Sequence, residues 1–386
     1  MITHARGRSP LYRVHELLNS VVGFFRSNVV LTIALCAAGI SMLLVPPDAA
    51  YASYFDYKTL TCLFTTLAVI CALRNIHFFT TVAQKIVRMA GNLRMTVLAM
   101  IYITFIGSML IANDMALLTF LPLGYFALSS TKKDQYMAPM FILQNIAANL
   151  GGMLTPFGNP QNLYLYEKFM IPNGEFMGIM LVPFLVSVAL ITVCCLFFPK
   201  EEMTLGEKVD GKLPPKKTAL YLVLFASTLL IVFRVIPYWT GLIVIPLALL
   251  FLDRKALLAV DYPLLGTFAA FFIFSGNMGR MEAVRSLFSA LLNLNTMIVS
   301  ALSCQFISNV PSAILLSQFT ENYPELLIGV NIGGCGTLIA SLASLITFRS
   351  FLYYNPGKGK KYFLLFSAFN FGFLIVLALA MTLIRG

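Results

Sequence analysis

The feature that most constrains this chain is a series of long apolar segments that lack charged residues. Residues 176–198 run for 23 positions without an Asp, Glu, Lys, Arg or His. A helix needs about 20 apolar residues to cross a bilayer. A chain of 386 residues that is 59% hydrophobic and 11% charged carries far fewer charges than a soluble domain does. The sequence therefore predicts an all-α polytopic membrane protein.

The apolar segments predict nine single spans and two helical hairpins. The hairpins are predicted at 95–128 and 295–320. The single spans are predicted at 29–45, 57–73, 137–165, 176–198, 218–236, 239–252, 262–279, 325–348 and 362–384.

Lys and Arg placement predicts the orientation of these spans. If each hairpin returns to the side it left, 21 of the 27 Lys and Arg residues lie on the side of the amino terminus. Basic residues concentrate in cytoplasmic loops. We therefore expect a cytoplasmic amino terminus and a carboxyl terminus outside the cell. The net charge of +11 then reflects cytoplasmic loops rather than binding to nucleic acid.

Three segments recur in the same order in both halves of the chain. The stretch "FDYKTLTCLFTTLAVI" from Phe55 resembles "VDYPLLGTFAAFFIFS" from Val260, and "IANDMALLTFLPL" from Ile111 resembles "ISNVPSAILLSQF" from Ile307. The stretch "NLGGMLTPFGNPQNLYL" from Asn149 aligns without a gap to "NIGGCGTLIASLASLIT" from Asn331. The copies begin on opposite sides of the membrane, which indicates an inverted-topology repeat, the architecture of secondary transporters.

The repeat predicts the organisation of the chain. We expect a cytoplasmic amino-terminal segment 1–28, a first repeat 29–198, a cytoplasmic linker 199–217, a linking transmembrane helix 218–236 and a second repeat 237–386. The amphipathic segment 74–92 is expected to lie at the interface and to connect a fixed scaffold to a mobile unit.

The stretch "TPFGNPQN" interrupts a predicted membrane helix with helix breakers and amides. Non-helical backbone at this depth survives only where it lines a protein-enclosed cavity, so we expect a binding site here, although Gly, Ser and Asn also favour plain helix packing. The second copy carries glycines and hydroxyls in register. The predicted substrate-binding residues of the two broken helices are Thr155, Gly158, Asn159, Gln161, Asn162, Gly336, Thr337, Ser341 and Ser344.

The two hairpin tips, "IANDMA" and "ISNVPS", supply the remaining predicted site residues. Asn113 and Asn309 match by register, and Ser308 precedes the second asparagine. The start of a half-helix favours an anion, and the carbonyls before it suit a small cation. Asp114 is the one ionisable residue deep within a predicted span, which marks a functional site by default, although a structural helix-capping role is the alternative. We therefore expect Asn113, Ser308 and Asn309 to bind both the substrate and the coupling ion, and Asp114 to bind the coupling ion.

At these motifs the chain resembles the ion-transporter superfamily, which includes divalent-anion/sodium symporters, citrate transporters, arsenite permeases and sodium/proton antiporters. The resemblance covers nearly the whole chain, and "TPFGNPQN" and "SNVP" are its most specific pieces. It implies two re-entrant hairpins, two broken helices, a homodimer and an elevator motion. Ala112, Asp114 and Val310 depart from the Ser-Asn-Thr tips of the dicarboxylate symporters.

These observations predict a secondary transporter of a small anion, with a di- or tricarboxylate as the first substrate hypothesis, coupled to Na⁺ or H⁺ in a bacterial inner membrane. The alternatives are efflux of arsenite or another inorganic oxyanion, and a Na⁺/H⁺ antiporter. An enzyme is not expected, because no His–carboxylate cluster, HExxH or Cys–His pair falls within the spans. No cofactor or metal other than Na⁺ is expected, and the seven cysteines are predicted to be small buried apolar residues.

Overall fold

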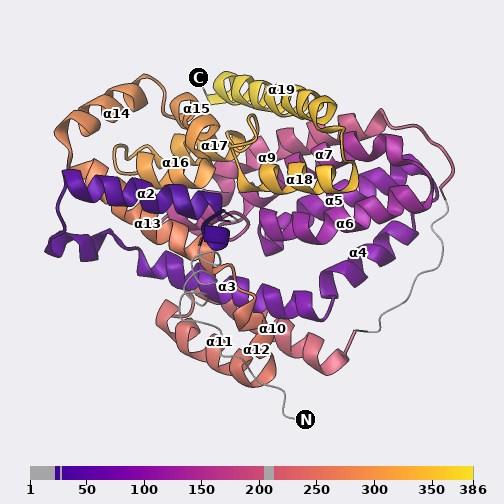
Figure 1. Cartoon of the computed structure of the whole chain (residues 1–386), viewed down its shortest axis with the longest axis horizontal. Helices are drawn as coiled ribbons and strands as arrows, with labels where there is room; N and C mark the ends of the chain where they lie inside the picture. The colour runs from indigo at the N-terminus through magenta and orange to yellow at the C-terminus, as the bar shows by residue number, and fades with distance from the viewer. Residues whose placement is uncertain (1–21, 27, 204–212, 386) are drawn as a thin grey trace, which may run out of the picture.

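The structure, a computed structural model, describes residues 22–26, 28–203 and 213–385, and these form a bundle of helices (Figure 1). The predicted segment 1–28 and linker 199–217 fall in part outside the described residues. The elements of the first half are α2 (Val29–Leu44), η1 (Ala49–Tyr54), α3 (Tyr57–Asn75), α4 (Phe78–Arg88), α5 (Leu93–Ile111), α6 (Asn113–Ser130), η2 (Asp134–Tyr136), α7 (Met137–Gly151), η3 (Gly152–Leu154), α8 (Pro160–Lys168) and α9 (Asn173–Leu196). Those of the second half are α10 (Pro215–Val232), α11 (Tyr238–Leu252), α12 (Arg254–Leu258), α13 (Tyr262–Arg280), α14 (Glu282–Leu294), α15 (Thr296–Ile307), α16 (Asn309–Leu316), α17 (Tyr323–Ile332), α18 (Leu342–Tyr354) and α19 (Gly359–Arg385).

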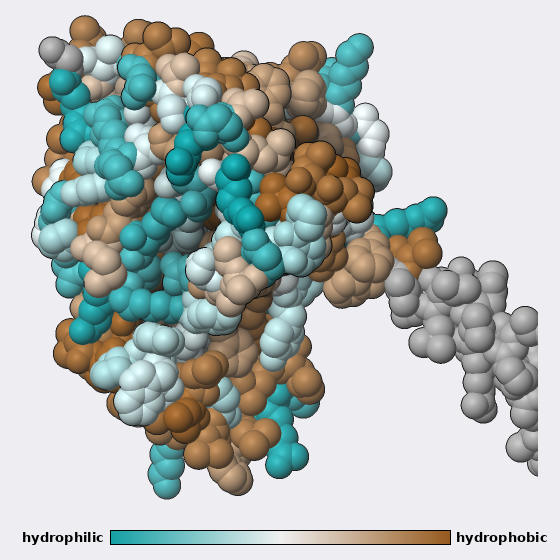
Figure 2. Space-filling model, turned by 90° about the vertical axis from the view of Figure 1, so that its left-hand side faces the viewer, coloured by the Kyte–Doolittle hydropathy of each residue, from teal (hydrophilic) through white to brown (hydrophobic). Residues whose placement is uncertain are grey.

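The surface of this bundle is that of a membrane protein. Five described helices, α3, α5, α9, α10 and α19, are long and apolar enough to cross a bilayer. Large apolar side chains such as Leu43, Phe197 and Leu383 are each 83% exposed, and Figure 2 shows hydrophobic residues over much of one side of the molecule. Soluble proteins rarely expose so much apolar surface. The chain is therefore a multi-pass membrane protein, as predicted.

Each predicted hairpin consists of two helices joined by a single residue. Ala112 joins α5 to α6, and Ser308 joins α15 to α16. The helices of each pair fold back on one another: Gly107 lies against the ring of Phe120 in the first pair, and the Ser303 and Ser312 hydroxyls lie 3.0 Å apart in the second.

Both predicted spans that contain the glycine-rich motifs are broken in the structure. The first is helical to Gly151, passes through η3 and five non-helical residues, and becomes helical again at Pro160. The second ends as α17 at Ile332 and restarts as α18 at Leu342. The breaks begin where paired glycines follow the aligned asparagines, and proline at the start of α8 suits the first turn of a helix.

An amphipathic helix directly precedes the hairpin in each half of the chain. The predicted interfacial segment 74–92 forms α4, between α3 and α5. Its counterpart α14, between α13 and α15, was not predicted, because residues 280–294 were assigned to a loop. Both helices have one apolar and one polar face. The polar residues of α14 are dispersed along its sequence, "EAVRSLFSALLNL".

The helices gather into two groups. Helix α2 packs along α13, and α3 packs against α10, α11 and α12 at one end of the molecule (Figure 1). The hairpins pack with the broken helices and with α9 and α19. The seven cysteines are free, and Cys36 is exposed and Cys194 partly exposed. The prediction that all seven are buried was therefore wrong for these two, because α2 and α9 turn one side to the lipid.

Candidate functional site

Asn149 connects the first hairpin to the second broken helix. Its Oδ1 accepts a hydrogen bond of 3.1 Å from the Asn113 amide at the start of α6. Its Nδ2 donates to the Ser341 hydroxyl at 3.0 Å and to the Gly334 carbonyl at 3.4 Å. Because buried polar groups need partners, this one side chain fixes the start of α6 against the second break.

Asn331, the residue aligned with Asn149, makes the reciprocal connection to the first broken helix. Its Nδ2 donates to Asn162 Oδ1 at 2.6 Å, and its Oδ1 accepts from Asn159 at 3.2 Å and from Gln161 at 3.4 Å. All four side chains are buried. Neither Asn149 nor Asn331 was among the predicted site residues, although each begins an aligned stretch, and that matching position was the signal that could have found them.

One threonine in each break forms a hydrogen bond to the hairpin of the same half. The Thr155 hydroxyl donates to the Met109 carbonyl at 3.0 Å, and the Thr337 hydroxyl donates to the Gln305 carbonyl at 3.0 Å. The alignment of the broken helices matches the two threonines, and the alignment of the hairpins matches the two carbonyls. The same contact therefore occurs in both halves.

The two hairpin tips have nearly the same backbone. Ala112 has φ 65° and ψ 152°, and Ser308 has φ 75° and ψ 158°, a region that non-glycine residues rarely adopt. Asn113 and Asn309 follow, and each side-chain oxygen accepts a 2.9 Å hydrogen bond from the backbone N–H of the next residue. Such strained positions persist where the surrounding structure holds them, and they cluster at functional sites.

Glycine is required at one position in each break. A Cβ on Gly158 would lie 2.3 Å from the Gly152 carbonyl oxygen. Gly336 has φ +122°, and its Cβ would lie 2.0 Å from Gln305 Oε1. These predicted residues therefore permit the unwound backbone.

Gln305 holds the second break open and was not predicted. Its Nε2 donates to the carbonyls of Gly333 and Cys335 at 2.9 and 3.0 Å, and its Oε1 accepts from the Thr337 N–H at 2.8 Å. The matching residue of the first hairpin is Met109, which lacks an amide. There Asn162 has that role, because its Nδ2 donates to the carbonyls of Gly152, Met153 and Thr155.

Four helix starts meet in this polar network. Asn113 at α6 reaches Ser341 at α18 through Asn149, and the Asn309 N–H at α16 donates to the Ala340 carbonyl at 2.9 Å. Asn159 at α8 donates to the Asn149 carbonyl at 3.2 Å. Helix starts carry partial positive charge, so the network favours an anion without an arginine.

The other predicted residues lie in or beside the same network. Ser344 lies 2.9 Å from the Ser341 hydroxyl, and the Ser308 hydroxyl donates to Asn309 Oδ1 at 3.3 Å and to the Ala340 carbonyl at 3.4 Å. Asp114 occupies the first turn of α6. No hydrogen-bond partner for its buried Oδ1 occurs among the described residues.

A buried ion cluster lies at the far end of α8. Glu167, whose side chain is 1% exposed, pairs with Lys58 of α3 at 2.5 Å and with Arg234 beyond α10 at 3.3 Å. Arg234 also lies 3.8 Å from the centre of the Tyr166 ring. The cluster connects the first broken helix to both α3 and α10. It was missed because the predicted span ended at residue 165.

The chain is similar to known transporters. A family model described as a citrate transporter matches residues 21–323. An uncharacterized transporter of Methanocaldococcus jannaschii is 34% identical over 297 residues, which cover 76% of this chain and 81% of the relative. Inner membrane protein YbiR of Escherichia coli is 27% identical over 329 residues, 82% of this chain and 85% of its own length.

Proposed function

The chain belongs to the citrate transporter family and is a membrane transporter rather than an enzyme, and we propose that it moves a small anion, a di- or tricarboxylate, by coupling to a Na⁺ or H⁺ gradient. The predicted resemblance to ion-transporter permeases is confirmed by the family match and by the two transporter relatives. The family's description supports citrate as the first substrate to test.

The observation that carries the proposal is the meeting of four helix starts and two unwound segments in one buried network. Backbone N–H groups at helix starts bind carboxylates well. Asn113, Asn159 and Asn309 lie at three of these helix starts, and the Asn113 and Asn159 amides donate to Asn149. Helix starts and amides then replace the arginine that often binds a multiply charged anion.

The duplicated contacts support an inverted repeat, 29–198 and 237–386, related across the helix at 218–236. In this proposal both hairpins are re-entrant. The hairpins, the broken helices, α9 and α19 form the moving unit, and α2, α3, α10, α11 and α13 form the scaffold. The moving unit would carry the substrate across the membrane as an elevator, with α4 and α14 as its connections.

The coupling cation would bind beside the tips, where Asn113, Asp114, Ser308 and Asn309 lie. The Met109 and Gln305 carbonyls near the ends of α5 and α15 accept from Thr155 and Thr337 of the two breaks, and carbonyls beside unwound backbone suit a small cation. The proposal further places the chain as a homodimer in a bacterial inner membrane, with its amino terminus in the cytoplasm. The inner-membrane name of the Escherichia coli relative supports that location.

The test is uptake of labelled citrate and succinate into proteoliposomes that contain the purified protein. A sodium gradient and a proton gradient are imposed separately, and protein-free liposomes serve as the control. Accumulation that needs one of the gradients supports the proposal. Vesicles that contain folded protein but accumulate neither acid under either gradient would rule out the carboxylate substrate, and arsenite and Na⁺/H⁺ exchange would be assayed next.

A further inference from the structure

A small enclosed cavity lies beside the first hairpin tip, outside the amide network. Its volume is about 30 Å³, and it lies between α3, the start of α6, the start of α13 and the first break with the start of α8. Three oxygen-bearing side chains line it, Thr66, Asp114 and Asp261, and the rest of its lining is mainly apolar. A cavity of this size holds one water or one small cation.

Two of the lining oxygens have no partner among the described residues. Thr66 is only 6% exposed, and its hydroxyl oxygen is buried without a hydrogen bond. Asp114 Oδ1 is likewise buried without a hydrogen bond. Buried polar atoms in native structures are almost always satisfied, so unsatisfied oxygens from two helices around one cavity indicate a missing ligand.

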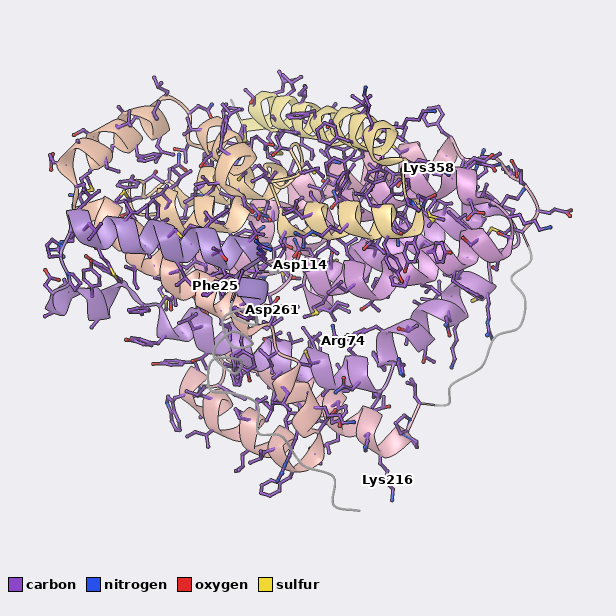
Figure 3. All side chains as sticks on the ribbon, viewed as in Figure 1. Phe25, Arg74, Asp114, Lys216, Asp261 and Lys358 are labelled. Atoms are coloured by element: carbon purple, nitrogen blue, oxygen red, sulfur yellow. The ribbon has the colours of Figure 1, made fainter. Side chains whose placement is uncertain are left out.

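Asp261 brings a second carboxylate to this cavity from a different helix. It caps α13, where its Oδ1 accepts a 2.9 Å hydrogen bond from the Leu264 N–H. Asp114 and Asp261 lie close together near the middle of the molecule in Figure 3, and both line the same cavity. Two carboxylates and a hydroxyl are hard oxygen donors, which bind Na⁺ or a proton and repel an anion.

Asp261 also lines a second, more open cavity of about 110 Å³. That cavity is bounded by the start of α2, by α13, and by α18 with Arg349. Asp261 therefore lies between the enclosed cavity and a route to the surface.

We infer that Asp114, Asp261 and Thr66 form a binding site for the coupling cation between the first hairpin and α3 and α13, and that Asp261 admits the cation from the more open cavity. This inference rests on the proposed function, and it assigns Asp261 and Thr66 to the coupling site. Because α6 belongs to the proposed moving unit and α3 and α13 to the scaffold, motion of the hairpin would take the site apart. Cation occupancy would then control that motion.

The charged groups around the site agree with a cation that can leave. Arg74 of α3 donates to the sulfur of Met115, the neighbour of Asp114, at 3.4 Å, and Arg349 of α18 lines the outer cavity. No ion pair to Asp114 or Asp261 forms among the described residues. Within this part of the chain, no fixed basic side chain therefore competes with a mobile cation for these two carboxyl groups.

The chain offers a matched control for Asp261. Asp56 occupies the aligned position and caps α3 in the same way, because its Oδ1 accepts a 2.9 Å hydrogen bond from the Thr59 N–H. Asp56 does not line the cavity that contains Asp114. Asparagine also caps helices well, so Asp261→Asn and Asp56→Asn preserve both caps, and only the first removes a charge from the proposed site.

The test measures the reaction of Asp114 with dicyclohexylcarbodiimide, to whose central carbon the oxygen of a protonated carboxyl adds in an apolar setting while the proton moves to nitrogen. Purified protein in liposomes is labelled over a range of pH, with and without sodium, and the peptide that contains Asp114 is quantified by mass spectrometry. Asp114→Asn identifies the labelled peptide. The assay needs no transport substrate, so its result is independent of whether citrate is transported.

We expect Asp114 to be labelled, and the labelling to respond to cation. If the cation is sodium, Asp261→Asn should need about threefold more sodium than wild type for the same protection of Asp114. If the cation is a proton, the variant should need about a threefold higher proton concentration for the same labelling. In both cases the reason is that one of two attracting charges is lost. Thr66→Val should act in the same direction, and Asp56→Asn should match wild type. An unchanged cation requirement in Asp261→Asn, an equal shift in Asp56→Asn, or no labelling of Asp114 would overturn the inference.

Discussion

The two hairpin tips have the same backbone and different chemistry. Ala112 and Ser308 share a left-handed φ, and the asparagine after each closes the same 2.9 Å hydrogen bond to the next residue. The next residue is Asp114 in the first tip and Val310 in the second. The two tips therefore share their backbone geometry and differ in their side chains.

This difference indicates a division of roles between the halves. Among the described residues, only the first tip brings a carboxylate to a cavity lined by a second carboxylate. The second tip is uncharged and is tied to α18 by the Asn309 N–H. The account therefore places cation binding at the first tip, with Asp261 of the second half beside it, and gives the anion helix starts from both halves.

The largest expected effects come from the glycines that allow each break. Gly336→Ala must place a Cβ 2.0 Å from Gln305 at φ +122°, and Gly158→Ala must place one 2.3 Å from a Gly152 carbonyl. Strain and overpacking of this kind cost about 3 kcal/mol or more. Gly178→Ala is the control, because nothing lies within 4 Å of its Cβ. Thermal loss of monodisperse protein in detergent measures the effect, and a break variant as stable as the control would contradict the geometry.

The next largest effects come from the two asparagines that connect the halves. Asn331→Ala leaves the Asn162 side-chain oxygen without its donor. Asn149→Ala leaves the Asn113 amide without its acceptor. Each variant should lose about 1–3 kcal/mol of stability and most citrate uptake. Exposed Asn293→Ala on α14 is the control. Full uptake by either connecting variant would show that its contacts are dispensable.

The threonine pair compares the halves directly. Thr155→Val and Thr337→Val each remove one 3.0 Å hydrogen bond while keeping the side-chain shape. Each should lower stability by about 1 kcal/mol, with equal size in both halves. Exposed Thr382→Val provides the background. Clearly unequal losses in the same thermal assay would mean that the two breaks are supported differently.

The smallest effect lies outside the compared region, at the exposed pair between Asp48 and Arg280. The Arg280 guanidinium lowers the pKa of Asp48 below its ordinary value of 3.8. The stabilisation is therefore fully present above that ordinary pKa and is lost as the pH falls through the lower, folded value. Asp48→Asn should reduce thermal stability slightly at neutral pH and match wild type once the acid is protonated. A difference that persists in strong acid would contradict this account.

Much of the fold could be predicted because membrane helices are recognisable from their apolar composition. The 23 uncharged residues 176–198 became α9, and the proline and glycine of "TPFGNPQN" marked the first break. Helix α14 was missed because a short amphipathic helix has neither the length nor the apolar content of a span.

The site could be predicted only as far as local sequence reaches. Thr155, Asn159 and Asn162 stood out because amides and hydroxyls are rare in apolar helices. Asn331, by contrast, matters through partners about 170 positions away, and such pairing is set by tertiary packing. Asp261 reads as an ordinary helix cap, and only the three-dimensional structure places it on the cavity of Asp114.

The most direct test of the division of roles compares two kinds of citrate transport in the same proteoliposomes. One is accumulation driven by a cation gradient, and the other is exchange of labelled for unlabelled citrate without a gradient. The account predicts that Asp114→Asn loses accumulation but keeps exchange, whereas Asn309→Ala loses both. Accumulation by Asp114→Asn at the wild-type level, or loss of exchange as complete as in Asn309→Ala, would contradict the assignment of the cation to the first tip.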